Sequence, residues 1–361
     1  MDKKASFFYK KLINWYLKNK RELPWRKTND PYKIWLSEIM LQQTRVAQGL
    51  PYYHKFLKAF PTIKELALAH EDEILKLWQG LGYYSRARNL HATAQNVYYN
   101  MDGVFPLEFK EILKLKGVGD YTASAIASIS YNQPYAVVDG NVYRVLSRVF
   151  SIDTPINSSS GIKEFKKLAQ ELIDTDQPGI YNQAIMEFGA RYCVPQNPDC
   201  SNCIFNDRCL AFKNKKVAAL PVKIKSKPVK KRYFNYMVIT SENDKTLLRQ
   251  RTQKGIWQKL YEFPLIETTT EISPQEINEL ESFKDFSENL NIESISLYNE
   301  ENKLHKLSHQ HLYTKFWIVK LNEILSEENM IDNKSIPFSE IKEYAVPVLI
   351  ADFVAEFFEA Y

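Results

Sequence analysis

Residues Leu113–Tyr121 read LKLKGVGDY, and residues Thr122–Ser130 continue as TASAIASIS. The pattern predicts a helix, a tight turn at Gly117 and Gly119, and a second helix built from small residues. Glycine adopts positive φ angles and lets another backbone approach closely. The first amides of the second helix have no partner within the helix, so they can bind an anion. An ordinary helical hairpin would show the same pattern, so this segment alone leaves the function open.

The residues on both sides of this hairpin also predict helices. Phe8, Leu12, Trp15 and Tyr16 recur at helical spacing, and so do apolar residues between Ile34 and Leu41. Proline and glycine separate the runs, at Pro24, Pro31, Pro51, Pro61, Gly80, Gly82, Gly103 and Pro106. We therefore expect an all-helical domain that extends to about residue 215.

Two carboxylates stand out on either side of the hairpin. Residues Ile34–Thr44 read IWLSEIMLQQT and place Glu38 among apolar residues. Burial disfavours the charged form and raises the pKa of a carboxyl group, which can then act as a general acid near neutral pH. A buried glutamate paired with an arginine or capping a backbone would look the same.

The second carboxylate follows an apolar run. Residues Ala136–Arg144 read AVVDGNVYR, so Asp139 precedes a glycine at the expected start of a helix. Aspartate often caps the N-terminus of a helix. On its own this segment favours a capping role over a chemical one.

The four cysteines form one local group with the spacing Cys193-x6-Cys200-x2-Cys203-x5-Cys209. A disulfide scaffold would distribute its cysteines along a small secreted chain, so this group predicts a metal centre in a reducing compartment. Four thiolates at this spacing suit either a structural zinc ion or an iron–sulfur cluster. The basic residues beside them could contact a DNA backbone or form a solvated surface; they are Arg191, Arg208, Lys213, Lys215 and Lys216.

The hairpin, the AVVDGNVYR segment and the cysteine spacing occur in the order found in the endonuclease III superfamily of helix–hairpin–helix DNA glycosylases. SEIMLQQT at Ser37–Thr44, LPWR at Leu23–Arg26 and GLGYYSRAR at Gly80–Arg88 resemble the MutY family of adenine DNA glycosylases. The resemblance covers nearly the whole chain. It implies a helical catalytic domain at 1–215, in which about 25–130 form a six-helix part. The N-terminal helix and 131–215 would form a part that holds a [4Fe-4S] cluster on Cys193, Cys200, Cys203 and Cys209.

The resemblance also implies a reaction. Glu38 would protonate a ring nitrogen of adenine, and Asp139 would stabilise the oxocarbenium-like sugar, as paired carboxylates do in glycoside hydrolysis. Tyr121 and Asn141 would orient these groups. Superfamily members that also cleave the DNA strand carry a lysine at position 121, which forms a Schiff base. The tyrosine there predicts a monofunctional glycosylase.

Further residues match family positions that contact DNA. The adenine must leave the base stack to reach the pocket, and Trp25, Arg26 and Glu187 resemble residues that line it. Gln43 and Tyr83 resemble residues that fill the vacated helix; without the resemblance, a surface amide and a core tyrosine would be the simpler interpretations. The remaining predicted DNA contacts are Thr44, Leu81, Gly82, Gly117, Val118 and Gly119.

Beyond about residue 215 the composition changes. A basic, proline-containing segment predicts a linker at 216–230, followed by a mixed α and β domain at 231–361. Tyr233–Thr240, Thr246–Arg251 and Tyr313–Leu321 have the bias of strands, and Pro274–Phe283 and the residues from Val346 onward that of helices.

This second domain resembles a Nudix fold. Residues Lys254–Pro264 (KGIWQKLYEFP) resemble its start, but the glycine and acidic helix of the Nudix metal box are absent, so we expect no pyrophosphatase activity. Leu307-Ser308-His309 resembles the loop with which MutY proteins read 8-oxoguanine, with leucine in place of the usual phenylalanine. A polar hairpin tip would explain the same residues.

The composition is compatible with an enzyme that acts on nucleic acid, but it does not establish that function. A chain of 361 residues with a net charge of +5 suggests more than one domain and only weak overall attraction to DNA. No run of about 18 apolar residues and no signal peptide is evident. We expect a cytoplasmic monomer without a membrane span, associated with the nucleoid if bacterial, that acts on duplex DNA with adenine opposite 8-oxoguanine or guanine.

Three other functions would fit parts of this sequence. Tyr121 and the second domain disfavour an endonuclease III-like glycosylase-lyase that acts on oxidised pyrimidines. A thymine mismatch glycosylase shares the tyrosine but normally lacks that domain. The presence of both Glu38 and Asp139 disfavours a non-enzymatic iron–sulfur DNA sensor.

Overall fold

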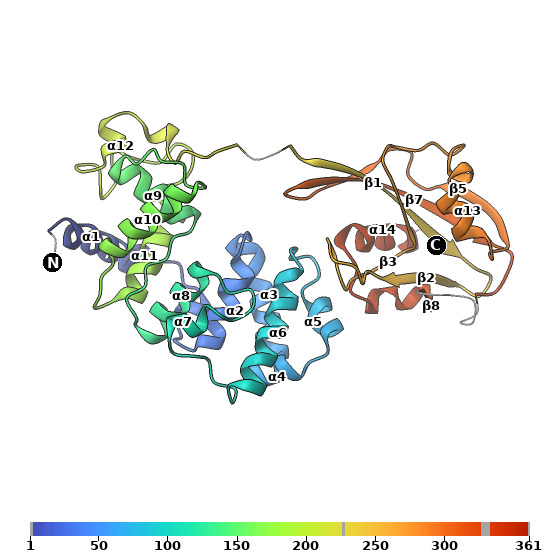
Figure 1. The fold of residues 1–361 in the computed structure, drawn as a ribbon, viewed down its shortest axis with the longest axis horizontal. Coiled ribbons are helices and arrows are strands. Elements are labelled where there is room, and N and C mark those ends of the chain that lie inside the picture. Colours follow the sequence, from blue (N-terminus) through green and yellow to red (C-terminus); the bar gives the residue numbers. More distant parts are fainter. Residues whose placement is uncertain (1–2, 226–227, 326–332, 360–361) are drawn as a thin grey trace. The chain divides into compact units, whose positions relative to one another are not determined.

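The computed structural model describes residues 3–225, 228–325 and 333–359. By its contacts the chain divides into two units, residues 1–68 with 89–226 and residues 69–88 with 227–361. Figure 1 follows the elements in chain order from blue to red. None of the described helices is both long enough and apolar enough to cross a bilayer.

The first unit consists of helices, as the sequence predicts up to about residue 215. They are α1 (Lys3–Asn19), η1 (Pro24–Arg26), α2 (Pro31–Leu41), α3 (Val46–Ala59), α4 (Ile63–Leu68), most of α6 (Ser85–Asn100), α7 (Phe109–Ile112), α8 (Asp120–Tyr131), α9 (Gly140–Phe150), α10 (Ser159–Leu172), α11 (Pro178–Arg191), α12 (Leu210–Lys213) and η2 (Val217–Ala219). The short helix α5 (Glu71–Leu77) belongs to the segment 69–88.

The local sequence explains where several of these helices begin and end. Asp30 caps α2 by accepting a hydrogen bond from Tyr32 N, with Pro31 as the first helical residue. Asn132 ends α8 in the left-handed conformation. Pro51, which was expected to separate helices, instead lies inside α3. Its ring leaves the carbonyl of Ala47 without a helical donor, and Ala47 is exposed, so water can reach it.

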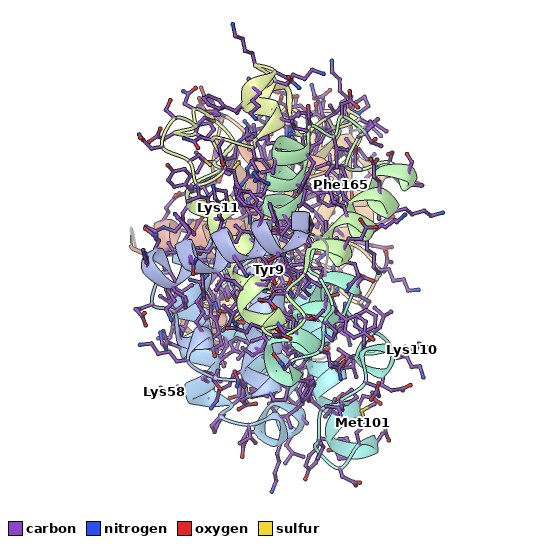
Figure 2. The ribbon with its side chains drawn as sticks, turned by 90° about the vertical axis from the view of Figure 1, so that its left-hand side faces the viewer. Tyr9, Lys11, Lys58, Met101, Lys110 and Phe165 are labelled. Carbon is purple, nitrogen blue, oxygen red and sulfur yellow. The ribbon has the colours of Figure 1, made fainter. Side chains whose placement is uncertain are left out.

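The core of the first unit lies where α1, α9, α10 and α11 meet. Phe8 and Leu12 of α1 and Phe165 of α10 are almost completely buried there. Figure 2 labels Phe165 and, on α1, Lys11, whereas Lys58 is exposed on α3. The Lys11 ammonium donates to the Ile204 carbonyl at 2.7 Å, which ties α1 to the cysteine-containing segment.

The hairpin between α7 and α8 requires its first glycine. Gly117 has φ +77°, and a Cβ atom there would lie 2.7 Å from Asn89 Cβ, so another residue would be strained and would clash. Gly119 is the N-cap of α8, has no side-chain cap, and has open space around the position of a Cβ atom. The first amides of α8 are therefore accessible to a ligand.

The second unit combines two sheets with helices. Its strands are β1 (Lys230–Thr240), β2 (Lys245–Gln250), β3 (Tyr261–Glu262), β4 (Leu265–Thr268), β5 (Ile292–Leu297), β6 (Lys303–Lys306), β7 (Gln310–Leu321) and β8 (Lys334–Pro337). The larger sheet has the order β4-β1-β7-β5, with β6 also paired to β7, and the smaller has the order β3-β2-β8. β1 and β7 run parallel, with Tyr233 opposite Tyr313.

Helices complete this unit. Met237, Trp317 and Val319 on one face of the larger sheet pack against Phe283 of α13 (Glu281–Ser287). Phe353 of α14 (Val348–Glu359) stacks on Phe316, with ring centroids 4.0 Å apart.

The strands and the C-terminal helix predicted from sequence are present, but the helix predicted at Pro274–Phe283 is misplaced. A turn and the short 3-10 helix η3 (Ile277–Glu279) occupy its first part, and α13 begins only at Glu281. The reason is the extended backbone of Leu280, with ψ 125°, which interrupts the helical path.

Candidate active site

Both predicted carboxylates line one pocket of the first unit. Its volume is about 170 Å³, close to that of cavities of about 150 Å³ that take up benzene. Glu38 comes from α2, Tyr121 from α8, Asp139 and Asn141 from the start of α9, and Glu187 from α11. Residues far apart in the sequence thus contribute to a space that is suited to a planar ring.

Glu38 is positioned by a helix that is buried along most of its length. Its side chain is 8% exposed. Burial raises the pKa of Glu38, a hydrogen bond from Tyr121 lowers it, and the charge of Asp139 raises it again, with a result of about 7. This is the direction predicted from its apolar neighbours, so Glu38 can hold a proton near neutral pH.

Tyr121 lies in the first turn of α8, directly after the hairpin. Its hydroxyl is 3.1 Å from Met186 Sδ and hydrogen-bonds the Glu38 carboxyl group. Burial, followed by the charges of Glu38 and Asp139, raises the pKa of Tyr121 well above its ordinary value. Tyr121 therefore stays neutral and serves as a hydrogen-bond donor.

Asp139 is the N-cap of α9, so the capping interpretation of this residue is correct as far as it goes. One carboxylate oxygen accepts from Asn141 N at 2.9 Å and Val142 N at 2.8 Å, and the other accepts from Asn141 Nδ2 at 2.8 Å. Burial raises the pKa of Asp139, while these donors and Arg144 lower it. These hydrogen bonds favour the anion, but burial is the largest effect and leaves the pKa of Asp139 above its ordinary value.

Hydrogen bonds connect Asp139 to the cysteine-containing segment. Arg144 donates through one nitrogen to Asn141 Oδ1 at 2.8 Å and to the Gly189 carbonyl at 2.6 Å. Its Nε donates to the Cys193 carbonyl at 2.7 Å. Gly189 is required beside α9, because a Cβ atom there would lie 2.8 Å from Asn141 Cβ.

Glu187 forms a charged wall of the pocket with two arginines. Its carboxylate accepts from Arg21 Nε at 2.8 Å and Nη2 at 2.6 Å, and from Arg26 Nη2 at 2.8 Å. Burial would raise the pKa of Glu187, but the hydrogen bonds from Arg21 and Arg26 lower it to about 2. Trp25 lines the same pocket, packed edge-on against Tyr53.

Sequence reasoning missed several lining residues, among them Arg21, Gln183 and Met186. The signal for Arg21 was the buried position of Glu187, which requires a cation. Gln183 and Met186 carry no sequence signal, because α11 brings them to the pocket only through its packing.

The other predicted DNA-contacting residues vary in position. Thr44 lines the pocket, whereas Gln43, just beyond α2, is exposed with φ 56°. Leu81, Gly82 and Tyr83 lie between α5 and α6, where Leu81 is buried and Tyr83 is 44% exposed with φ 48°. The hairpin residues Gly117, Val118 and Gly119 and the loop residues Ser308 and His309 lie outside the pocket. Ser308 and His309 are exposed at the tip of the β6–β7 hairpin.

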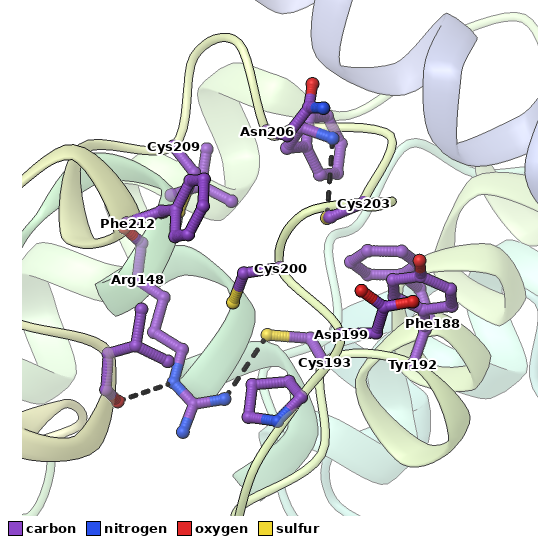
Figure 3. Close-up of a pocket in the computed structure, with 14 residues that line it drawn as sticks. Arg148, Phe188, Tyr192, Cys193, Asp199, Cys200, Cys203, Asn206, Cys209 and Phe212 are labelled. Carbon is purple, nitrogen blue, oxygen red and sulfur yellow. Dashed lines mark hydrogen bonds between the residues drawn. The ribbon is translucent and has the colours of Figure 1, made fainter. Parts of the chain in front are cut away.

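All four cysteines line a second cavity, between α9 and the segment that follows α11 (Figure 3). Arg148 of α9 lies beside them and is 2% exposed. Burial raises the pKa of the Cys203 thiol to about 12. Within the described residues, no group of three potential ligands is already arranged around a single ion position. The four thiols instead line the wall of the cavity.

Fold and pocket define the class, a helix–hairpin–helix DNA glycosylase with an appended Nudix-like domain. Residues 36–174 match the model of the HhH-GPD superfamily of base excision DNA repair proteins, and residues 235–356 match that of the NUDIX domain. A thermostable thymine-DNA glycosylase has a similar structure, with a TM-score of 0.55 and 29% identity over 59% of this chain and 98% of that one. Endonuclease III in a complex with DNA has the same fold, with a TM-score of 0.52 and 20% identity over 60% and 98%.

Sequence relatives narrow the class. The adenine DNA glycosylase of Buchnera aphidicola (subspecies Baizongia pistaciae) is 38% identical over 91% of this chain and 90% of its own length. That of Rattus norvegicus is 44% identical over 59% of this chain and 44% of its own. The chain therefore belongs to the adenine DNA glycosylase family, enzymes that hydrolyse N-glycosidic bonds. The resemblance and the two-domain fold class predicted from sequence are confirmed.

Proposed function

We propose that this chain removes adenine that is mispaired with 8-oxoguanine or guanine in duplex DNA, as a monofunctional glycosylase of base excision repair. The observation that carries the proposal is the pairing of Glu38, whose pKa is about 7, with Asp139 in one pocket of 170 Å³. The relatives are adenine DNA glycosylases, which indicates that the excised base is adenine. The pair of carboxyl groups accounts for the hydrolysis of the glycosidic bond.

In the proposed mechanism Glu38 acts first, as a general acid. Adenine is a poor leaving group, and protonation of a ring nitrogen lets it accept the electron pair of the glycosidic bond as that bond breaks. The proton moves from the Glu38 carboxyl group to the base, which leaves Glu38 as an anion. Tyr121 holds the carboxyl group in place through its hydrogen bond.

Asp139 acts on the sugar. Loss of the base leaves positive charge on the anomeric carbon, and a fixed carboxylate nearby stabilises it. Asn141 keeps Asp139 oriented by donating from both its backbone and its side-chain nitrogen. A water molecule then adds to the anomeric carbon, and Glu38, now a carboxylate, can accept the proton that the water gives up.

The polar wall of the pocket suits an extruded base. Arg26 is held at the pocket by Glu187 and by its own hydrogen bond to the Arg21 carbonyl at 3.0 Å. Trp25 offers an apolar surface to the ring. Base extrusion leaves a gap in the duplex, and we assign Gln43 and Tyr83 to that gap; each is exposed and held at positive φ just after or before a helix.

DNA binding away from the pocket is assigned to the hairpin. The open N-terminus of α8 at Gly119 can bind a backbone phosphate through its amides. Such a contact positions the duplex without reading its sequence.

The four cysteines are proposed to hold a [4Fe-4S] cluster. The fit rests on four thiols around one cavity and on a buried cation, Arg148, beside them. When bound, the cluster would cross-link the segment from Cys193 to Cys209, and no step of base excision passes through it.

Excision measured on a panel of duplexes tests the function. Single-turnover rates are compared for adenine opposite 8-oxoguanine, guanine, cytosine and thymine, and for thymine opposite guanine. We expect the fastest excision of adenine opposite 8-oxoguanine, slower excision opposite guanine, and none of thymine. Faster removal of thymine than of adenine would reject the proposal in favour of a thymine mismatch glycosylase.

The pH profile of excision should fall on the alkaline side with a midpoint near pH 7. Glu38 must be protonated to act, its pKa is about 7, and so the active fraction decreases tenfold per pH unit above that value. Activity should also fall on the acidic side, where Asp139 takes up a proton. Because the pKa of Asp139 is raised, this fall should occur at a higher pH than for an ordinary aspartate. The measurement is kcat/KM against pH, and a constant value from pH 6 to 9 would contradict the role of Glu38.

Borohydride should fail to trap this chain on DNA during excision. A trapped complex needs a Schiff base between an amine and the sugar, and in the described part of the chain no lysine lines the pocket. The positive control is Tyr121→Lys, which places an amine at the position that carries lysine in strand-cleaving relatives. Trapping of the unaltered chain as efficient as that of the control would show a second, lyase activity.

Ser308→Ala and His309→Ala should each reduce the preference for 8-oxoguanine over guanine opposite adenine. Each side chain is exposed at the tip of the β6–β7 hairpin, and a lost hydrogen bond of about 0.5–1.5 kcal/mol corresponds to roughly two- to tenfold in rate ratio. Ser294→Ala, at an exposed position on β5 of the same unit, is the control. An unchanged ratio in both loop variants would remove these residues from guanine recognition.

A further inference from the structure

Arg148 is a buried cation whose side chain donates to no carboxylate within the described residues, although Asp199 lines the same cavity. It lies on α9 one turn after Arg144 and is 2% exposed. In the described part of the chain, the acceptors of its guanidinium group are four backbone carbonyls and the Cys193 sulfur atom. A guanidinium group keeps its proton in proteins, and a buried charge without a counter-ion is costly.

Its hydrogen bonds join the two ends of the cysteine-containing segment. On the side of Cys193, Arg148 Nη1 donates to the Val194 carbonyl at 2.7 Å and Nη2 to the Pro195 carbonyl at 2.9 Å. Beyond Cys209, Nε donates to the carbonyls of Val217 and Leu220, each at 3.1 Å. One planar group therefore holds the chain directly after Cys193, the first cysteine, and again beyond Cys209, the last.

The same group also faces the sulfur atoms. Arg148 Nη1 is 3.5 Å from Cys193 Sγ, and Figure 3 shows the guanidinium group beside the sulfur atoms of Cys193 and Cys200. The Cys209 thiol donates to the Arg148 carbonyl at 3.4 Å. Arg144, one turn earlier on α9, carries the same charge and repels Arg148, so it does not balance that charge.

We propose that Arg148 is a positioning residue for the cluster, supplying its buried counter-charge and fastening both ends of the segment that holds it. The inference rests on the [4Fe-4S] cluster of the proposed function. Four thiolates bring more negative charge than an iron–sulfur core balances, and this excess is opposite in sign to the buried charge of Arg148.

Charge and geometry have separable effects. A buried cation beside the cluster stabilises its more negative, reduced form, so removing the cation makes the reduction potential more negative. Loss of the hydrogen bonds loosens the segment, and outer-shell changes of this kind cost about 10–100-fold in metal retention.

The test compares Arg148→Gln and Arg148→Lys in the full chain, with Arg208→Gln as control. Arg208 lies in the same segment, but its side chain is 60% exposed, so water screens its charge. Reduction potential is measured by voltammetry, and cluster retention by the loss of visible absorption and of iron to a chelator. Neither readout depends on base excision.

Arg148→Gln is expected to shift the potential to a more negative value and to lose iron about 10–100-fold faster. Arg148→Lys keeps the charge but cannot reach both ends of the segment, so it should lose iron faster at a nearly unchanged potential. Arg208→Gln should resemble the unaltered chain. Failure of Arg148→Gln alone to incorporate the cluster would also support the proposal.

An unchanged potential in Arg148→Gln, or an equal shift in Arg148→Lys, would overturn the charge assignment. Unaltered retention in both would overturn the fastening role. If the unaltered chain contains no iron and sulfide after anaerobic reconstitution, the cofactor assignment itself fails, and that result is distinct from a failure of Arg148.

Discussion

Glu38→Gln should slow adenine excision by about 10²–10⁴-fold, the usual contribution of a positioned general acid. Glutamine has the shape of a protonated glutamate but no acidic proton to give to the base. The side chain is buried and hydrogen-bonded to Tyr121, and glutamine preserves both features, so the fold and the affinity for DNA should change little. The measurement is the single-turnover rate on adenine opposite 8-oxoguanine.

Glu65→Gln provides the matched control, because Glu65 is an exposed glutamate on α4, outside the pocket. Its rate should equal that of the unaltered chain. DNA affinity of Glu38→Gln is measured in parallel by anisotropy. A loss of rate that is fully explained by weaker binding would show that Glu38 holds the substrate and does not protonate it.

The hairpin and the helical domain around it could be predicted because their signals are local. Gly117 must adopt positive φ, and the small residues of α8 permit close packing, so the sequence alone carries that information. The expectation that Pro51 separates two helices was wrong because it, too, relied on a local signal alone. The local rule for proline predicts a helix end, yet α3 continues through it, and Ala47, whose carbonyl loses its helical donor, is exposed to water.

The pocket could be predicted only through family resemblance. Residue context suggested that Glu38 is buried and that Asp139 caps a helix, but nothing in the sequence brings the two together. Their proximity results from the packing of α2 against α8 and of α9 against α11. Gln183 and Met186, which complete the pocket, went unnoticed because side chains on one face of α11 acquire meaning only in that packing.

The second unit was harder to predict in detail. The long strands β1 and β7 are apolar and aromatic, so their sequences are distinctive. β5, β6 and β8 read IESISL, KLHK and KSIP and are largely exposed or half-buried. Short polar strands are stabilised by hydrogen bonds to neighbouring strands, a contribution that no local pattern records.

Asp139→Asn should reduce excision by about 10²–10³-fold, the effect expected when one preorganised electrostatic group is removed from a transition state. Asparagine still caps a helix, since its side-chain oxygen can accept from Asn141 N and Val142 N. The change therefore removes the charge and keeps the N-cap, but the new amide nitrogen faces Asn141 Nδ2, so the hydrogen bond from that nitrogen is lost. Asp139→Asn should therefore lower the thermal stability less than Asp139→Ala, which also loses about 1 kcal/mol of stability with the cap.

The charges of the two carboxyl groups interact, so Asp139→Asn should also change the pH dependence of the residual activity. The negative charge of Asp139 contributes to the raised pKa of Glu38. When that charge is removed, the Glu38 carboxyl group should lose its proton more readily, so the alkaline limb of the residual activity should move to lower pH. If the midpoint stays near pH 7 in Asp139→Asn, the groups do not interact, and Asp139 acts at the sugar without affecting the acid.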